Sequence, residues 1–142
     1  MNKKLIGRIE KIDFPSLGLF NIDAKIDTGA YSSAIHCHYI LEDVEAGLLY
    51  FKLLDPSHTV YNEKKLIVDT YSKTQVKNSM GKKENRYKIK TSIHIGKKEY
   101  ITNFTLTDRT GMRVPILLGR KVLKGRFLVD ASEKYILTLK NI

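Results

Sequence analysis

The tripeptide Asp27-Thr28-Gly29 is the segment of this sequence best suited to chemistry, since a carboxylate directly follows an alternating apolar run. At the end of a strand, the Asp27 carboxyl group would be aimed into a cleft, and the Thr28 hydroxyl could hydrogen-bond across an interface. Gly29 lets the backbone approach a neighbour closely and donate its N–H to the carboxylate. Alone, the tripeptide is equally compatible with an ordinary turn.

A second element lies about 90 residues downstream, where three apolar residues precede Gly119 and Arg120. The pattern of residues 115–120, taken with Asp27-Thr28-Gly29-Ala30, resembles the retropepsins, the single-domain aspartic peptidases of retroviruses and their cellular relatives. In that family the apolar-Gly strand crosses beneath the Asp-Thr-Gly loop. The resemblance implies that Leu118, Gly119 and Arg120 support the site formed by Asp27, Thr28 and Gly29.

A closer resemblance is to the bacterial retropepsin-like family historically labelled "ATP-dependent zinc protease", some members of which are linked to an ATP-grasp ligase that adds glutamates to a ribosomal protein. The residues that carry it are Arg86, Met112 and the segments 25–30, 33–36, 105–109, 117–120 and 123–130. Asp108, Ala131 and Tyr31 depart from the family's usual Asn, Pro and Lys, without touching the Asp-Thr-Gly tripeptide.

The resemblance implies aspartic-type peptidase chemistry, which needs two carboxylates. One Asp-Thr-Gly is present, because Asp69-Thr70-Tyr71 lacks the glycine. We therefore expect a homodimer in which Asp27 of each subunit forms the dyad and the two carboxyls share one proton. No cofactor and no metal is expected, since the chain has neither a G-x-x-x-x-G-K-[ST] phosphate loop nor an H-E-x-x-H helix.

Five residues are candidates for substrate binding. Guanidinium groups bind carboxylates well, so Arg86 and Arg109 would select acidic peptides. The alternative is that both are exposed surface residues. Gly81 is a candidate for the tip of a flap, and the alternative is that it lies in an irregular loop. His36 would orient the active-site loop or contact substrate. The alternative is an ordinary hydrogen-bonded strand residue. These candidates are Ala30, His36, Gly81, Arg86 and Arg109.

The run His36-Cys37-His38 suggests metal binding at first sight. On a strand, however, the two histidines share one face while Cys37 takes the other, and two ligands are too few for four-coordinate zinc. The sequence favours Cys37 as a small buried hydrophobic residue rather than a nucleophile.

The 25 Lys and Arg residues exceed the 15 Asp and Glu residues, giving a formal net charge of +10. This excess is compatible with a solvated surface, with acidic substrates or with nucleic acid. The main hypothesis is an aspartic endopeptidase that favours acidic or glutamate-rich peptides and is linked to an ATP-grasp glutamate ligase and the ribosome. The alternatives are a catalytically silent peptide-binding module of the same fold and a basic ribosome- or RNA-associated protein.

The elements that must position these residues are mostly strands. Alternating runs rich in β-branched and aromatic residues predict strands at 5–14, 19–26, 48–54, 64–70, 87–95, 100–106 and 127–139. One short helix is expected at 120–123, ended by Gly125, and another turn within 38–47; residues 71–86 are expected to form a loop or a projecting hairpin. We predict a single all-β domain over residues 1–142, a small closed acid-protease barrel.

No apolar run is long enough to cross a membrane, and the start of the chain acquires another charge, at Arg8, before the apolar region of a signal peptide could develop. Cys37 is the only cysteine. These features predict a cytoplasmic protein with no membrane contact.

Overall fold

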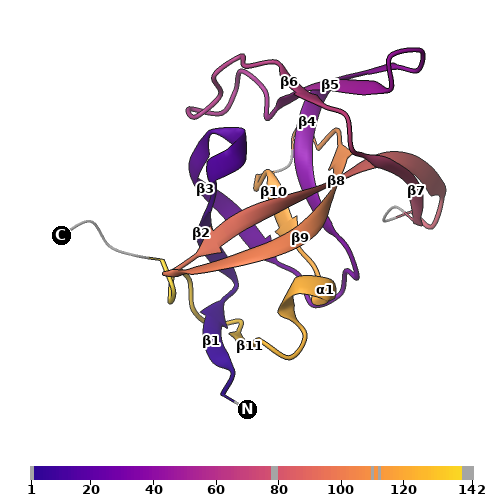
Figure 1. Ribbon diagram of the computed structural model, residues 1–142. Coiled ribbons are helices and arrows are strands. Elements are labelled where there is room, and N and C mark those ends of the chain that lie inside the picture. The colour runs from indigo at the N-terminus through magenta and orange to yellow at the C-terminus, as the bar shows by residue number, and fades with distance from the viewer. Residues whose placement is uncertain (1, 78–79, 110, 112, 139–142) are drawn as a thin grey trace.

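The computed structural model describes residues 2–77, 80–109, 111 and 113–138, and strands dominate it, as the alternating patterns predict (Figure 1). The elements in chain order are β1 (Lys4–Gly7), β2 (Ile9–Phe14), the 3₁₀ turn η1 (Pro15–Leu17), β3 (Leu19–Ile26), β4 (Ser33–Asp43), β5 (Leu48–Leu53), β6 (Leu66–Val68), β7 (Ser72–Lys77), β8 (Lys83–Ile95), β9 (Lys98–Thr107), β10 (Ile116–Leu118), α1 (Arg120–Leu123) and β11 (Phe127–Asp130).

Six strands close into a barrel in the order β10-β3-β2-β8-β9-β4, which confirms the predicted fold class. The ring closes because β10 pairs parallel with β3 on one side and antiparallel with β4 on the other. Outside the ring, β5 and β6 extend the sheet from β4, β7 pairs with the first half of β8, and β1 and β11 form a separate parallel pair (Figure 1). Closure removes most of the exposed edges that short strands would otherwise leave.

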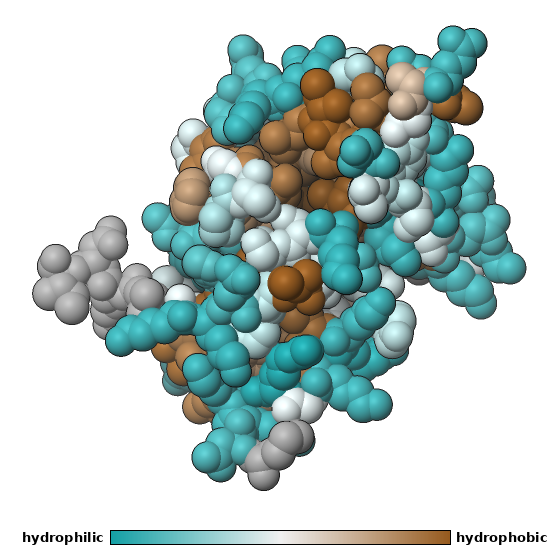
Figure 2. Space-filling model, viewed as in Figure 1, coloured by the Kyte–Doolittle hydropathy of each residue, from teal (hydrophilic) through white to brown (hydrophobic). Residues whose placement is uncertain are grey.

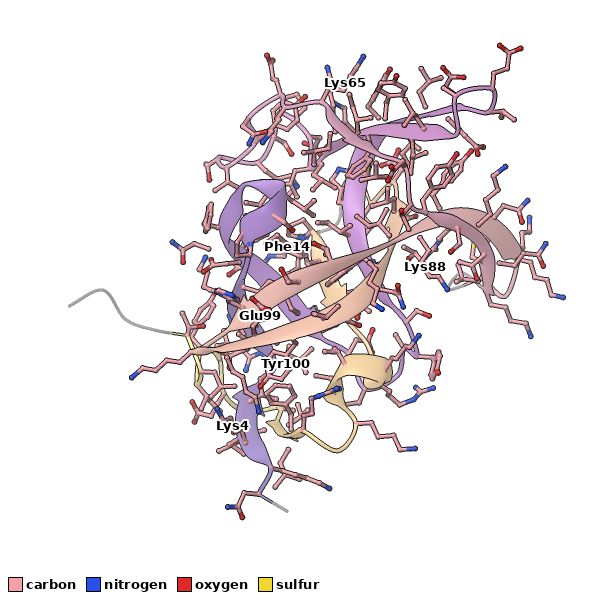
Figure 3. All side chains as sticks on the ribbon, viewed as in Figure 1. Lys4, Phe14, Lys65, Lys88, Glu99 and Tyr100 are labelled. Carbon is pink, nitrogen blue, oxygen red and sulfur yellow. The ribbon has the colours of Figure 1, made fainter. Side chains whose placement is uncertain are left out.

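The core lies inside this ring and follows from the alternation of the strands. In β2, Ile12 and Phe14 are buried while Lys11 and Asp13 between them are not. Figure 3 labels Phe14, whose ring meets that of Phe104 from β9 edge-on, with 5.2 Å between centroids. Burying such aromatic rings contributes about 1.5–3 kcal/mol each, so strand alternation is the main source of core stability.

The structure differs from the sequence prediction most in β4. The turn expected within 38–47 is found at 44–47, but the strand before it, β4, was not among the predicted strands and continues to Asp43. The first five residues of β4, Ser33 to Cys37, are all buried, on both faces of the strand, and β9 and β10 pair with its two edges. A strand buried on both faces has no alternation to detect.

The last predicted strand, 127–139, was too long, since β11 ends at Asp130. The short α1 helix forms at 120–123 as predicted, and Gly125 behind it has a φ of +80°. Four positions named in the sequence patterns, Asn78, Ser79, Met112 and Leu139, lie outside the described residues.

β7 and the first half of β8 form a projecting hairpin, one of the two alternatives expected for residues 71–86, with pairs from Ser72↔Lys88 to Lys77↔Lys83. Gly81 lies in the connecting turn with a φ of +79°. At the base of the hairpin, the Glu42 carboxylate accepts hydrogen bonds from the Tyr71 and Tyr87 hydroxyls, at 2.7 and 2.9 Å, and pairs with Lys73 at 2.9 Å. Glu42 therefore fastens the hairpin to β4.

A second carboxylate, Glu10, is completely buried on β2 and joins distant parts of the chain. Its two oxygens accept backbone N–H groups from Gly7 and from residues 136, 137 and 138, at 2.8–3.0 Å. The Thr138 hydroxyl adds a fifth hydrogen bond at 2.8 Å. These bonds hold the segment after β11 against the start of the barrel, in place of the strand pairing that the sequence suggested.

The helices in the described residues are a few residues long, and none has the length and apolar character needed to cross a membrane.

We predict that Glu10→Gln lowers the free energy of unfolding by about 2–4 kcal/mol, because an amide N–H₂ would face backbone donors that then lose their acceptor. Urea denaturation measures the change. Glu99→Gln is the control, since Glu99 is exposed and contacts His94 at 3.2 Å. Equal losses in the two variants would contradict the role given to Glu10.

The Glu42 anchor predicts a pH dependence. Hydrogen bonds from Tyr71, Lys73 and Tyr87, the Tyr71 bond having the largest effect, lower the pKa of Glu42 from 4.5 to about 2. A depressed folded-state pKa gives stability that is complete above the unfolded value and is lost as the pH falls through the folded value. The stability difference between the wild type and Glu42→Gln should thus be constant above pH 4.5 and shrink towards pH 2 in denaturation series. A difference that does not change with pH would refute the anchor.

Candidate active site

Asp27 follows the last residue of β3 and is partly exposed. Its backbone N–H donates to the Leu118 carbonyl of β10 at 2.9 Å, and its Oδ1 accepts the Gly29 N–H at 2.9 Å. Within the described part of the chain, Oδ2 accepts no hydrogen bond. The carboxylate is therefore oriented by one backbone donor while its second oxygen stays available.

The loop after Asp27 is held by the segment that leaves β10. The Ala30 and Tyr31 carbonyls accept the backbone N–H groups of Arg120 and Lys121, at 2.8 and 3.0 Å. The Arg120 side chain donates from Nη1 to the Thr28 carbonyl at 3.0 Å. Arg120 thus contacts the loop through both backbone and guanidinium.

Gly119 lies where no side chain fits. A Cβ atom at this position would stand 2.5 Å from the Ser32 carbonyl oxygen and 2.8 Å from that of Ala30. The Gly119 N–H donates to the Ser33 hydroxyl at 3.1 Å, a contact that the sequence analysis did not foresee. The loop that carries Asp27 therefore lies directly against the backbone of Gly119.

The predicted arginines come together near this loop. Arg109 is partly buried, and its pKa is lowered by burial and by the positive charge of Arg86, while the negative charge of Asp27 opposes both effects. Arg86 pairs with Glu84 on its own strand at 3.0 Å. Among the described residues, no carboxylate lies within ion-pair distance of Arg109, and its buried Nε lacks a hydrogen-bond partner.

His36 is 1% exposed and faces the protein interior rather than solvent. Its Nε2 lies 2.5 Å from Asp55 Oδ2, and its Nδ1 accepts the Arg109 backbone N–H at 2.8 Å. An imidazole that accepts at Nδ1 carries its proton on Nε2, so Asp55 is the acceptor of that proton's hydrogen bond. Sequence reasoning missed Asp55, whose only signal was a carboxylate in the turn segment 55–58.

His36, Asp55 and His58 are also the described residues that could gather around a metal ion, since their ligand atoms lie within 4.8 Å of one another. A zinc-bound Nε2 requires a proton on Nδ1, which would then oppose the Arg109 N–H at 2.8 Å. The donor set of His36 therefore does not fit a metal ion, and the hydrogen-bonded arrangement accounts for both ring nitrogens.

The remaining candidates are separated from this cluster. Cys37 is buried, which raises the pKa of its thiol to about 12, as expected for a structural cysteine. His38 does not join His36; it is exposed and bonds the Leu54 carbonyl at 2.6 Å and the Tyr61 hydroxyl at 3.2 Å. A bulge between Cys37 and Tyr39 interrupts the alternation that the sequence implied.

Two open hollows lie on the part of the surface built by β4, β5 and β6, where Figure 2 shows apolar residues gathered. Neither is lined by Asp27, Arg86 or Arg109. They are lined by residues 41–45, 50 and 65 and by residues 48, 67–70 and 90.

Comparison with known proteins gives a family match over residues 5–140, to a family described as retropepsin-like aspartic endopeptidase RimB. Relatives named "Probable alpha-L-glutamate ligase" are 36% identical in Shewanella pealeana and Shewanella halifaxensis, over 96% and 99% of this chain but 30% and 31% of the relatives. The chain thus spans less than a third of the length of these curated relatives.

A crystal structure of a protein of unknown function from Legionella pneumophila has a similar fold, with a TM-score of 0.73 over 96% of this chain and 99% of that one. The two sequences are 24% identical, so the likeness concerns the fold.

The close approach at Gly119 leads to a prediction. Gly119→Ala should lower the free energy of unfolding by about 3 kcal/mol, because the new methyl group meets two backbone carbonyls that cannot move independently. Gly47→Ala is the control, since Gly47 also has a constrained backbone, with a φ of +66°, but open space around it, and should cost about 1 kcal/mol. Urea denaturation of both variants measures the two losses in free energy of unfolding. A loss in Gly119→Ala no larger than in Gly47→Ala would contradict the packing argument.

Proposed function

The chain belongs to the family of the retropepsin-like aspartic endopeptidase RimB, and from that premise we propose that it hydrolyses peptide bonds as a homodimer through paired Asp27 carboxylates. The match confirms the family resemblance found in the sequence. The observation that carries the proposal is the geometry of Asp27, a partly exposed carboxylate oriented by the Gly29 N–H and locked to β10.

Dimerisation follows from the need for a second carboxylate. A twofold axis beside Asp27 would bring it against its own copy. Two carboxylates about 3 Å apart cannot both be ionised, so the pair holds one proton and titrates as a unit. The ionised member takes a proton from the attacking water, and the protonated member donates to the carbonyl oxygen of the scissile bond.

The fixed loop supports this chemistry, because aspartic catalysis depends on position rather than on a strong base. The hydrogen bonds that join Leu118 and Arg120 to the loop, and Gly119 to Ser33 at the start of β4, are complete within one subunit. The monomer therefore carries a carboxylate already oriented for pairing, and less conformational freedom is lost when the dyad forms.

For the substrate, we propose acidic or glutamate-rich peptides. Arg109 lacks an ion-pair partner among the described residues and lies close enough to Asp27 to sense its charge. A guanidinium there would bind a substrate carboxylate next to the scissile bond. The relatives' name, probable alpha-L-glutamate ligase, is consistent with a glutamate-containing substrate and with a functional link to such a ligase acting on a ribosomal protein.

We predict that Asp27→Asn abolishes peptidase activity and leaves the fold intact, because the amide keeps the shape but removes the ionisable pair. Asp69→Asn, in the Asp-Thr-Tyr segment, is the matched control and should keep full activity. Turnover of a glutamate-rich peptide is measured together with sedimentation over a range of protein concentrations. Activity in Asp27→Asn, or full activity in a monomer, would exclude the shared dyad.

We predict that Arg109→Ala weakens binding of an acidic peptide by about 1–3 kcal/mol, and that of a neutral peptide of equal length much less. Arg113→Ala removes the same charge from an exposed position, and it controls for long-range attraction that salt would screen. Peptide titrations give the affinities. Equal losses for acidic and neutral peptides would assign Arg109 to structure.

A further inference from the structure

We propose that Asp55 and His36 are positioning residues, which fix the backbone at Arg109 and so determine how tightly the site holds an acidic substrate. The link to substrate rests on the proposed function. The hydrogen-bonded unit itself, Asp55–His36–Arg109, rests on the geometry alone.

The unit begins at a carboxylate that is already fixed. Asp55 Oδ1 accepts the Ser57 backbone N–H at 2.7 Å and also the Ser57 hydroxyl, which leaves Oδ2 directed at His36. These bonds, the Ser57 hydroxyl first, hold the pKa of Asp55 well below its usual range. Asp55 is therefore ionised at neutral pH and acts as a pure acceptor towards the His36 Nε2–H.

His36 connects three segments of the chain. Its backbone N–H donates to the Pro115 carbonyl at 2.8 Å, just before β10, and its carbonyl accepts the Leu54 N–H at 2.9 Å. Its ring reaches the segment after β9 through the Arg109 N–H. Because Asp55 holds the proton on Nε2, Nδ1 keeps the lone pair that this N–H requires.

Arg109 needs such an anchor. Its guanidinium lies close enough to Arg86 to be repelled, and it has no ion-pair partner within the described residues. A fixed backbone limits the directions in which such a long side chain can extend. The hydrogen bond that the Arg109 N–H donates to His36 Nδ1 supplies this restraint. It lies one residue from Asp108, whose carboxylate is 3.8 Å from the same nitrogen.

Two substitutions at His36 separate the halves of the unit. In His36→Asn, the amide oxygen can replace Nδ1 as acceptor for the Arg109 N–H, while the contact with Asp55 is lost. In His36→Gln, the amide nitrogen can replace Nε2 as donor to Asp55, while the contact with Arg109 is lost. His38→Asn and His38→Gln are matched controls, since His38 is exposed and bonds neither residue.

The first measurement is the affinity of a fluorescein-labelled glutamate peptide for each variant, with thermal unfolding as a check on folding. We expect His36→Gln to bind the peptide roughly tenfold more weakly than the wild type, as we expect for Arg109→Ala. The double variant, His36→Gln with Arg109→Ala, should bind no more weakly than either single variant. His36→Asn and the His38 controls should keep most of the affinity. Asp55→Ala should lose affinity and Asp55→Asn, which keeps an acceptor, should recover part of it.

If His36→Gln binds like the wild type while Arg109→Ala does not, the positioning role is wrong and the proposed function stands. If the wild type does not bind the glutamate peptide, the proposed substrate is wrong, and nitrogen NMR decides the positioning role separately. We then expect the His36 ring to carry its proton on Nε2 and none on Nδ1. In Asp55→Ala, the backbone amide hydrogen of Arg109 should exchange with solvent faster than in the wild type. The opposite tautomer, unchanged exchange, or stoichiometric zinc binding lost in His36→Asn would overturn the proposal.

Discussion

The hydrogen bonding of β10 to two strands at once is the constraint on which the rest of the structure depends. Its three residues pair with β3, and two of them, Ile116 and Leu117, also pair with β4; no other described strand joins these two ends of the ring. The same segment receives the Asp27 N–H and continues into Gly119, which must lack a side chain. The same segment, β10 with Gly119, therefore both closes the barrel and positions the Asp27 carboxylate.

Four carboxylates of the structure differ in the number of hydrogen bonds and ion pairs that they accept. Glu10, Glu42 and Asp55 each accept at least three hydrogen bonds or ion pairs and are committed to holding segments together. From the residues that the structure describes, Asp27 accepts one, from Gly29. Acceptor positions that are filled by donors within the protein are not open to water or substrate, so the Asp27 carboxylate keeps positions that the other three have lost.

The sequence predicted those parts of the molecule in which one local pattern decides the outcome. Alternation predicted the β8–β9 hairpin, and the Asp27 and Gly119 segments carried enough pattern for the site and its support to be expected together. It failed for β4, where burial on both faces removes the alternation. Asp55, Ser33 and Glu10 could not be assigned, because their partners lie far away in the chain and no spacing rule connects them.

The Glu10 contacts have a consequence for the order in which the chain acquires its structure. On a ribosome, β2 is made early, whereas the N–H groups of residues 136–138, which its carboxylate needs, are made more than 120 residues later. Until they arrive, burying Glu10 leaves a charge with too few donors, so the native start of the barrel is unfavourable in a nascent chain. Contacts of such long sequence separation also slow folding, and the native start of the barrel is thus completed only after residues 136–138 have been made.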